Sequence, residues 1–160
     1  IAALALIHRL MYQQEESENP NQVGVENLLG ELCQQLRTSN RHHPNIELEC
    51  DITPYTIGID HAVPLALFVV EAITNAYRHA FDEEVPGIIK LTFEIVDGEA
   101  LLSIADNGRG FQDMEQPGRM GTDLMNAFAE QVGGRAMVES TPGKGTVVRL
   151  AFPALETESA

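Results

Sequence analysis

Residues 67–81 constrain the chain most, because they combine an apolar helical surface with a polar stripe. Glu71, Asn75 and His79 recur at every fourth position, which places a carboxylate, an amide and an imidazole on one face of a helix. Asparagine is a weak helix former, and its amide is costly to bury without a partner. The stripe therefore predicts a core helix in which Asn75 meets either a bound ligand or a buried backbone group.

Length and charge narrow the class of protein. The chain has 160 residues, 44% of them hydrophobic, which predicts a single globular domain. Its 10 Lys and Arg against 24 Asp and Glu give a net charge of −14, so we expect no binding to nucleic acid. Four of the cations fall in or beside the polar motifs, either by chance or because a polyphosphate binds there: Arg78, Arg109, Arg119 and Lys144.

The two cysteines and the N-terminus indicate where the protein resides. Cys33 and Cys50 show no spacing typical of a metal site, and we expect both to be reduced packing residues in a cytoplasmic protein. The apolar residues 1–7 are too few to span a bilayer and lack the features of a signal peptide. Since the chain begins without Met, we expect it to be a piece of a longer protein.

Hydrophobic periodicity predicts an α+β fold, in which about three helices cover a mixed, mostly antiparallel sheet as two layers. Asp60 is a plausible N-cap for the helix that contains Asn75. The predicted helices are residues 1–13, 25–37, 60–81 and 121–132. The predicted strands are residues 46–50, 88–96, 100–105, 135–140 and 146–152. We expect a loop over 14–24, one domain over 25–153 and a disordered tail over 154–160.

Asp106 follows a predicted strand, at the end of the sheet where ligand crevices form. Its carboxylate can accept a hydrogen bond from the exocyclic amine of adenine. Guanine has an acceptor at that position, so a carboxylate there selects ATP over GTP. Gly108 and Gly110 would let the backbone bend close to the ligand. The alternative is a common Asn-Gly turn.

Two later glycine clusters add candidate ligands. Gly121 and Thr122 open a predicted helix whose free amides and dipole favour phosphate, and Arg119 could add positive charge. The alternative is a plain junction between loop and helix. Gly145 and Thr146 precede the last strand, and Thr146 could reach adenine directly or through a water. The alternative is a hairpin turn.

The four motifs in this order resemble the ATP-binding domain of the GHKL superfamily, which comprises gyrase, heat-shock chaperone, histidine kinase and MutL ATPases. The chain is most similar to the catalytic domain of sensor histidine kinases over roughly residues 25–153. Residues 71–80 resemble the asparagine box and residues 106–111 the first glycine box, while 121–124 and 143–146 resemble the later boxes.

The resemblance implies a Bergerat-type fold that binds ATP with Mg²⁺ and donates the γ-phosphate to a histidine on a separate helical hairpin. Asn75 would ligate magnesium, Glu71 would be the base, and Asp106 would bind adenine. The residues implied to neutralise phosphate charge are Arg78, His79 and Arg119. The implied partners are a phosphoacceptor helix of the same or a sister chain and a response regulator, in a full-length homodimer.

Finer features place the chain beside a known branch. The short segment between Gly110 and Gly121 resembles the short-lid histidine kinases close to the HWE group, although Glu71 stands where that group carries His. Residues 4–12 resemble the end of that branch's second dimerisation helix. Arg119 and Thr122 replace the first Gly and the Leu of the usual later glycine box, which could alter lid closure or nucleotide affinity.

None of the histidines lies in a phosphoacceptor motif, so we expect the acceptor helix to belong to a missing segment and the fragment not to autophosphorylate. The histidines interpreted as structural or surface residues are His8, His42, His43 and His61. Two alternatives stay open. One is an anti-sigma factor with serine kinase activity, and the other is a scaffold that has lost nucleotide binding.

Overall fold

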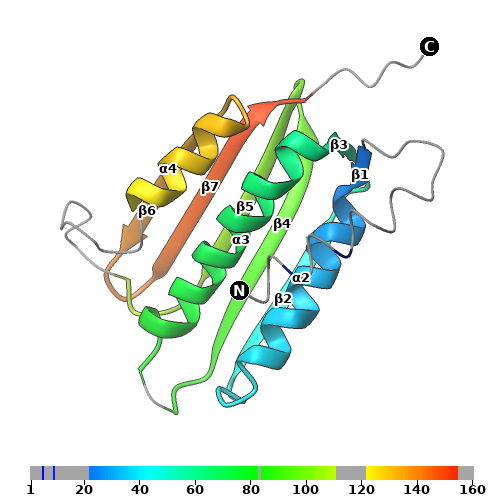
Figure 1. The fold of residues 1–160 in the computed structure, drawn as a ribbon. Coiled ribbons are helices and arrows are strands. Elements are labelled where there is room, and N and C mark those ends of the chain that lie inside the picture. Colours follow the sequence, from blue (N-terminus) through cyan, green and yellow to red (C-terminus); the bar gives the residue numbers. More distant parts are fainter. Residues whose placement is uncertain (1–4, 6–8, 10–21, 83, 111–121, 155–160) are drawn as a thin grey trace.

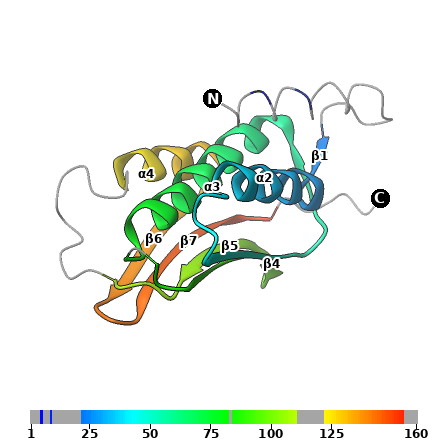
Figure 2. The same ribbon diagram turned by 90° about the horizontal axis from the view of Figure 1, so that it is seen from below.

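Three helices lie side by side on one face of a five-stranded sheet in the computed structural model, which confirms the predicted α+β architecture of two layers (Figures 1 and 2). The structure describes residues 5, 9, 22–82, 84–110 and 122–154, with 122 and 123 described by their backbone only. The helices are α2 (Val25–Ser39), α3 (Ile59–His79) and α4 (Thr122–Gln131). The strands of the sheet are β2 (Ile46–Ile52), β4 (Gly87–Val96), β5 (Glu99–Asp106), β6 (Arg135–Thr141) and β7 (Gly145–Pro153).

The sheet has the order β2-β4-β5-β7-β6 and is mixed, as predicted. β2 runs parallel to β4, and the other neighbours are antiparallel. A second, two-stranded sheet joins β1 (Gln22–Gly24) to β3 (Thr56–Gly58). Neither short strand was expected, and β1 lies within the predicted loop 14–24. Three residues are too few to show a period of two, so such strands leave little signal in a sequence.

Alternate residues of the central strands point toward the helices and form the core. On β5, for example, Ala100, Leu102 and Ile104 are buried. Helix α3 packs its apolar face against this layer and lies between α2 and α4 (Figure 1). With 21 residues it is long and apolar enough to cross a membrane, but 56% of the apolar window is buried within the protein. The apolarity of α3 is therefore explained by core packing.

The start of α3 differs from the prediction. Asp60 is not the N-cap, because the helix begins directly after β3 and Gly58 occupies the cap position without a side-chain hydrogen bond. Asp60 lies in the first helical turn instead, where its negative charge is favourable beside the positive end of the helix dipole. Near the N-terminus of the chain, Arg9 Nη2 forms an ion pair with Glu31 Oε2 on α2 at 3.6 Å.

The prediction that both cysteines are reduced is wrong, because the structure joins Cys33 and Cys50 in a disulfide. Cys33 lies on the buried face of α2 and Cys50 on β2, which returns beside that helix after a short turn. In the same region the Arg37 guanidinium donates to the Leu48 carbonyl at 3.0 and 2.8 Å. A cross-link over 17 positions stabilises a fold by about 3 kcal/mol, mainly by restricting the unfolded chain.

Candidate nucleotide site

Asn75 lies on α3 with only 6% of its surface exposed. Among the described residues, its Nδ2 is the buried side-chain nitrogen or oxygen that has no hydrogen-bond partner. A buried amide without a partner costs about 1–3 kcal/mol, so a position of this kind indicates an unfilled interaction. The sequence predicted that Asn75 meets either a bound ligand or a buried backbone group, and in the described structure Nδ2 bonds no backbone group.

The surroundings of Asn75 fit a magnesium ion whose coordination comes mainly from the phosphates of a bound nucleotide and from water. A half-turn of the side-chain amide exchanges Oδ1 and Nδ2, so the unpartnered position can present the oxygen that Mg²⁺ prefers. In the described ranges, no three His, Cys, Asp or Glu side chains gather into a site that could hold a metal ion by protein ligands alone. Glu71, one turn before Asn75, is half-buried on α3. A single amide oxygen therefore fits a magnesium whose other ligands are phosphate and water.

Asp106 ends β5 and is held by two backbone donors. Its Oδ1 accepts hydrogen bonds from Gly108 N at 2.9 Å and from Thr146 N at 3.2 Å. Burial raises the pKa of the Asp106 carboxyl, while these two hydrogen bonds act in the opposite direction. The carboxylate is thus oriented by the protein through one oxygen, and Oδ2 takes no part in either bond.

Three glycines of the motifs are required by close approaches within the protein. A side chain at Gly108 would collide with the Ala80 carbonyl, one at Gly110 with the Thr141 carbonyl, and one at Gly145 with the Asp106 carbonyl. The sequence predicted that Gly108 and Gly110 would approach the ligand. In the structure both glycines lie against protein backbone, so the Asp106 loop packs between the end of α3 and the turn that joins β6 to β7, and their approach to a ligand stays a prediction.

Thr146 is buried at the start of β7, opposite Asp106 in the register of β5 and β7. Its Oγ1 lies 2.8 Å from Ser140 Oγ on β6, while its backbone nitrogen donates to Asp106. Thr146 therefore supports the carboxylate through its backbone, and contact with adenine stays a prediction. Ser140 was not anticipated, because its place beside Thr146 depends on the pairing of β6 with β7.

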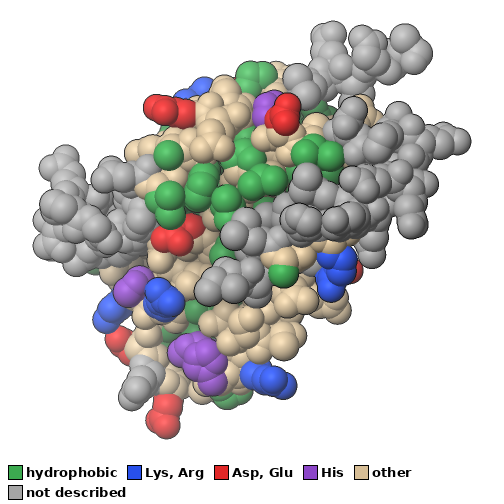
Figure 3. All heavy atoms as spheres, viewed as in Figure 1, with side chains coloured by type: hydrophobic (Ala, Val, Ile, Leu, Met, Phe, Trp, Pro, Cys, Tyr) green, Lys and Arg blue, Asp and Glu red, His purple; other side chains and the backbone are tan. Residues whose placement is uncertain are grey.

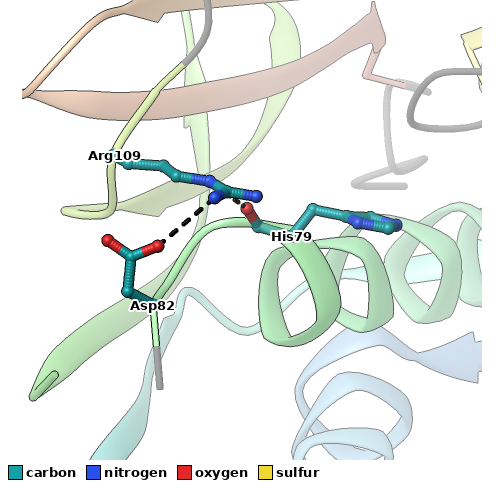
Figure 4. Close-up of polar contacts among 3 residues, drawn as sticks. All are labelled: His79, Asp82 and Arg109. Carbon is teal, nitrogen blue, oxygen red and sulfur yellow. Dashed lines mark hydrogen bonds and ion pairs between the residues drawn. The ribbon is translucent and has the colours of Figure 1, made fainter. Parts of the chain in front are cut away.

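Arginine and histidine side chains lie in the lower part of Figure 3, where α2 and α3 end. Arg78 is exposed and lines a groove of about 360 Å³ between these helices, together with His42 and His43. His79 is exposed, and its imidazole points away from Arg109 and Asp82 (Figure 4). The phosphate roles of Arg78 and His79 stay predictions.

The remaining predicted residues lie in or beside the segment 111–121. Arg119 and Gly121 are outside the described residues. Thr122 begins α4, close to the predicted helix start, and α4 packs against α3. A helix N-terminus favours phosphate, and the phosphate role of the α4 N-terminus stays a prediction.

Comparison with known proteins supports this arrangement. A sequence model of the family described as Histidine kinase-, DNA gyrase B-, and HSP90-like ATPase matches residues 60–156. The chain belongs to this family. The matched range includes Asn75, Asp106 and Thr146, and the predicted resemblance to the GHKL superfamily is confirmed.

Individual relatives come from two kinds of protein. An anti-sigma F factor of Clostridium botulinum (strain Alaska E43 / Type E3) is 35% identical over 128 residues, which cover 71% of this chain and 86% of the relative. The sensor histidine kinase LiaS of Bacillus subtilis is 31% identical over 136 residues, which cover 84% of this chain and 36% of LiaS. The chain therefore spans about a third of that kinase and most of the anti-sigma factor.

Solved structures show the same fold. The histidine kinase domain of the Erythrobacter litoralis blue-light activated histidine kinase superposes with a TM-score of 0.84 at 21% identity. The superposition covers 96% of this chain and 72% of that domain. The five-stranded sheet with its three helices is thus the fold of histidine kinase catalytic domains.

Proposed function

We propose that this domain binds Mg-ATP and donates the γ-phosphate to a histidine on a separate helical hairpin, as the catalytic domain of a two-component histidine kinase. The observation that carries the proposal is the Asn75 Nδ2, buried in α3 without a hydrogen-bond partner among the described residues. The family match supports nucleotide binding, and the second element of the site is Asp106, held at the end of β5.

The side chains contribute mainly by positioning and by charge, as is typical of phosphoryl transfer. Asp106 would accept a hydrogen bond from the adenine amine, and its orientation by two backbone donors is already in place. Asn75 would hold the magnesium ion, which when bound neutralises charge on the phosphates. Glu71, one turn before Asn75, would accept a proton from the attacking imidazole.

A serine kinase of the anti-sigma type is the second candidate. It is favoured by the 35% identity to an anti-sigma F factor and by the 86% of that relative which the chain covers. The histidine kinase proposal is favoured by the share of this chain that is matched, which is 84% for LiaS and 71% for the anti-sigma factor. Partners differ accordingly: a phosphoacceptor hairpin and a response regulator in one case, and a sigma factor with its regulator in the other.

Nucleotide binding is tested first, by titrating the chain with a fluorescent ATP analogue with and without Mg²⁺. We expect saturable binding that Mg²⁺ strengthens, and displacement by unlabelled ATP but not by GTP. Asn75→Ala is the matched variant and should lose the strengthening by Mg²⁺. Absence of saturable binding by the wild type would instead support a scaffold that has lost nucleotide binding.

Acceptor chemistry is tested next, with ATP labelled at the γ-phosphate. The chain is mixed in separate reactions with a dimerisation hairpin that carries the acceptor histidine and with a serine-containing anti-sigma antagonist. Phosphohistidine loses its label in acid and keeps it in base, whereas phosphoserine is stable in acid. Acid-labile label on the hairpin supports the histidine kinase, and acid-stable label on the antagonist supports the anti-sigma kinase.

A cytoplasmic location and a homodimer of the full-length protein belong to the histidine kinase proposal.

A further inference from the structure

Arg109 lies in the middle of the glycine loop, yet its side chain is turned toward the end of α3 (Figure 4). Nε donates to the His79 carbonyl at 3.0 Å, and Nη1 forms an ion pair with Asp82 Oδ1 at 3.3 Å. The sequence placed Arg109 among the cations available to a polyphosphate. In the structure its guanidinium is instead bonded to the helix end and the segment that follows.

The backbone of Arg109 extends the same connection. Its nitrogen donates to the Ala80 carbonyl at 2.7 Å, and its carbonyl accepts from Gly143 N at 2.7 Å. One residue is thus bonded to the end of α3, to Asp82 and to the turn between β6 and β7. The absence of a side chain at Gly108 permits this approach, because a Cβ there would collide with Ala80.

This connection joins the two elements of the candidate site. His79 is one helical turn after Asn75, and Asp106 is three positions before Arg109. The last carbonyls of a helix lack partners within the helix, and a cation beside them is favourable. Arg109 supplies both the donor and the charge, so its side chain links the position of the Asn75 helix to that of the Asp106 loop.

We propose that Arg109 is a positioning residue for nucleotide binding, which holds Asn75 and Asp106 at the separation that one Mg-nucleotide requires. This inference rests on the proposed function, and it assigns Arg109 no contact with phosphate. The ion pair with Asp82 contributes less to this link than the hydrogen bond to the His79 carbonyl. Its side chains are 59% and 67% exposed, and exposed ion pairs contribute little. The bond to the helix-end carbonyl is the greater part, because it acts directly on α3.

Four variants separate these contributions. Arg109→Met removes the whole side-chain link, and Arg109→Lys keeps the charge without the forked donors. Asp82→Asn removes only the ion pair. Arg149→Met is the matched control, since Arg149 pairs with Glu139 at 3.2 Å between β7 and β6. For each variant the dissociation constant of a fluorescent ATP analogue is measured with and without Mg²⁺, together with the melting temperature.

The effect of Mg²⁺ on the dissociation constant separates positioning from a general structural role, which would weaken binding equally with and without Mg²⁺. We expect Arg109→Met to weaken binding about tenfold with Mg²⁺ and less than about threefold without it, because Asp106 keeps its own two donors. Arg109→Lys should recover part of the loss. Asp82→Asn and Arg149→Met should stay within about twofold of the wild type. Hydrogen exchange in the last turn of α3 should be faster in Arg109→Met than in Arg149→Met.

The outcomes are distinguishable. If the wild type shows no Mg-dependent binding, the proposed function fails and the inference fails with it. If the wild type binds and Arg109→Met binds equally well, only the inference is overturned. An equal loss with and without Mg²⁺, accompanied by a lower melting temperature, overturns it too, because it would show a general structural role.

Discussion

Asn75 and Asp106 are the two polar side chains on which the candidate site depends, and the protein satisfies them very differently. Asp106 accepts two backbone hydrogen bonds through one oxygen. Asn75 is more deeply buried, and its Nδ2 has no partner within the part of the chain that the structure describes. The residue proposed to bind adenine is therefore oriented by the protein itself, whereas the residue proposed to hold magnesium keeps an amide nitrogen that no described residue satisfies.

The difference follows from where each residue lies. Asp106 is at the end of a strand, where the amides of its own loop and of β7 are free to donate. Asn75 is in the interior of α3, where the backbone carbonyls that could accept from Nδ2 already accept bonds along the helix. Because Nδ2 bonds no helix carbonyl in the described structure, an acceptor from outside the helix, such as a ligand, would satisfy it.

The largest expected effect is that of Asn75→Ala. We expect it to weaken Mg-dependent nucleotide binding by about 100-fold, or about 2.7 kcal/mol, because the metal loses its protein ligand. The free energy of unfolding without nucleotide should stay the same or rise by about 1 kcal/mol, since an unsatisfied buried amide is removed. Titration and urea denaturation measure the two quantities. A clear loss of stability would show that the amide has a partner within the folded chain.

Gly145→Ala tests whether the adenine end is built by the backbone. Gly145 has φ +107° and touches the Asp106 carbonyl, so a side chain there would displace Asp106 and cost about 2–3 kcal/mol of stability. Gly143→Ala is the control, because Gly143 has φ +80° but open space around it. It should cost only about 1 kcal/mol. Equal losses in thermal denaturation would mean that the close approach to Asp106 is unimportant.

Asp106→Ala should act in the opposite direction to Asn75→Ala on stability. Gly108 N and Thr146 N lose their acceptor, so we expect the free energy of unfolding to fall by about 1–2 kcal/mol. The preference for ATP over GTP should disappear in competition binding. A variant that is as stable as the wild type would show that water replaces the carboxylate without cost.

The smallest expected effect is a pH dependence of binding. Burial raises the pKa of Asp106 above 3.8, so the folded domain loses stability as the pH rises from 3.8 through the raised pKa. Adenine needs the ionised carboxylate, so affinity should fall several-fold as the pH is lowered into that window. Asp106→Asn should remove this part of the pH profile, while titration of the nucleotide itself persists. Identical profiles would exclude Asp106 as the titrating group.

Much of the fold and part of the site could be predicted from local patterns. The apolar period of α3 and the alternation in β4 and β5 depend on neighbouring residues only, and the structure has these elements close to the predicted positions. Asp106 was placed at a strand end for the same reason. The three-residue strands β1 and β3 were missed, because they form only by pairing with each other.

The sequence by itself determined the helix that carries Asn75, the strand that ends at Asp106 and the order of the glycine motifs that follow Asp106. Tertiary structure alone decided that Thr146, 40 positions away, donates to Asp106, that Arg109 turns to the end of α3, and that Cys33 pairs with Cys50. The physical reason is the range of the interactions. Periodicity and turn preferences act within a few residues, whereas these bonds depend on strand register and on how helices pack across the sheet.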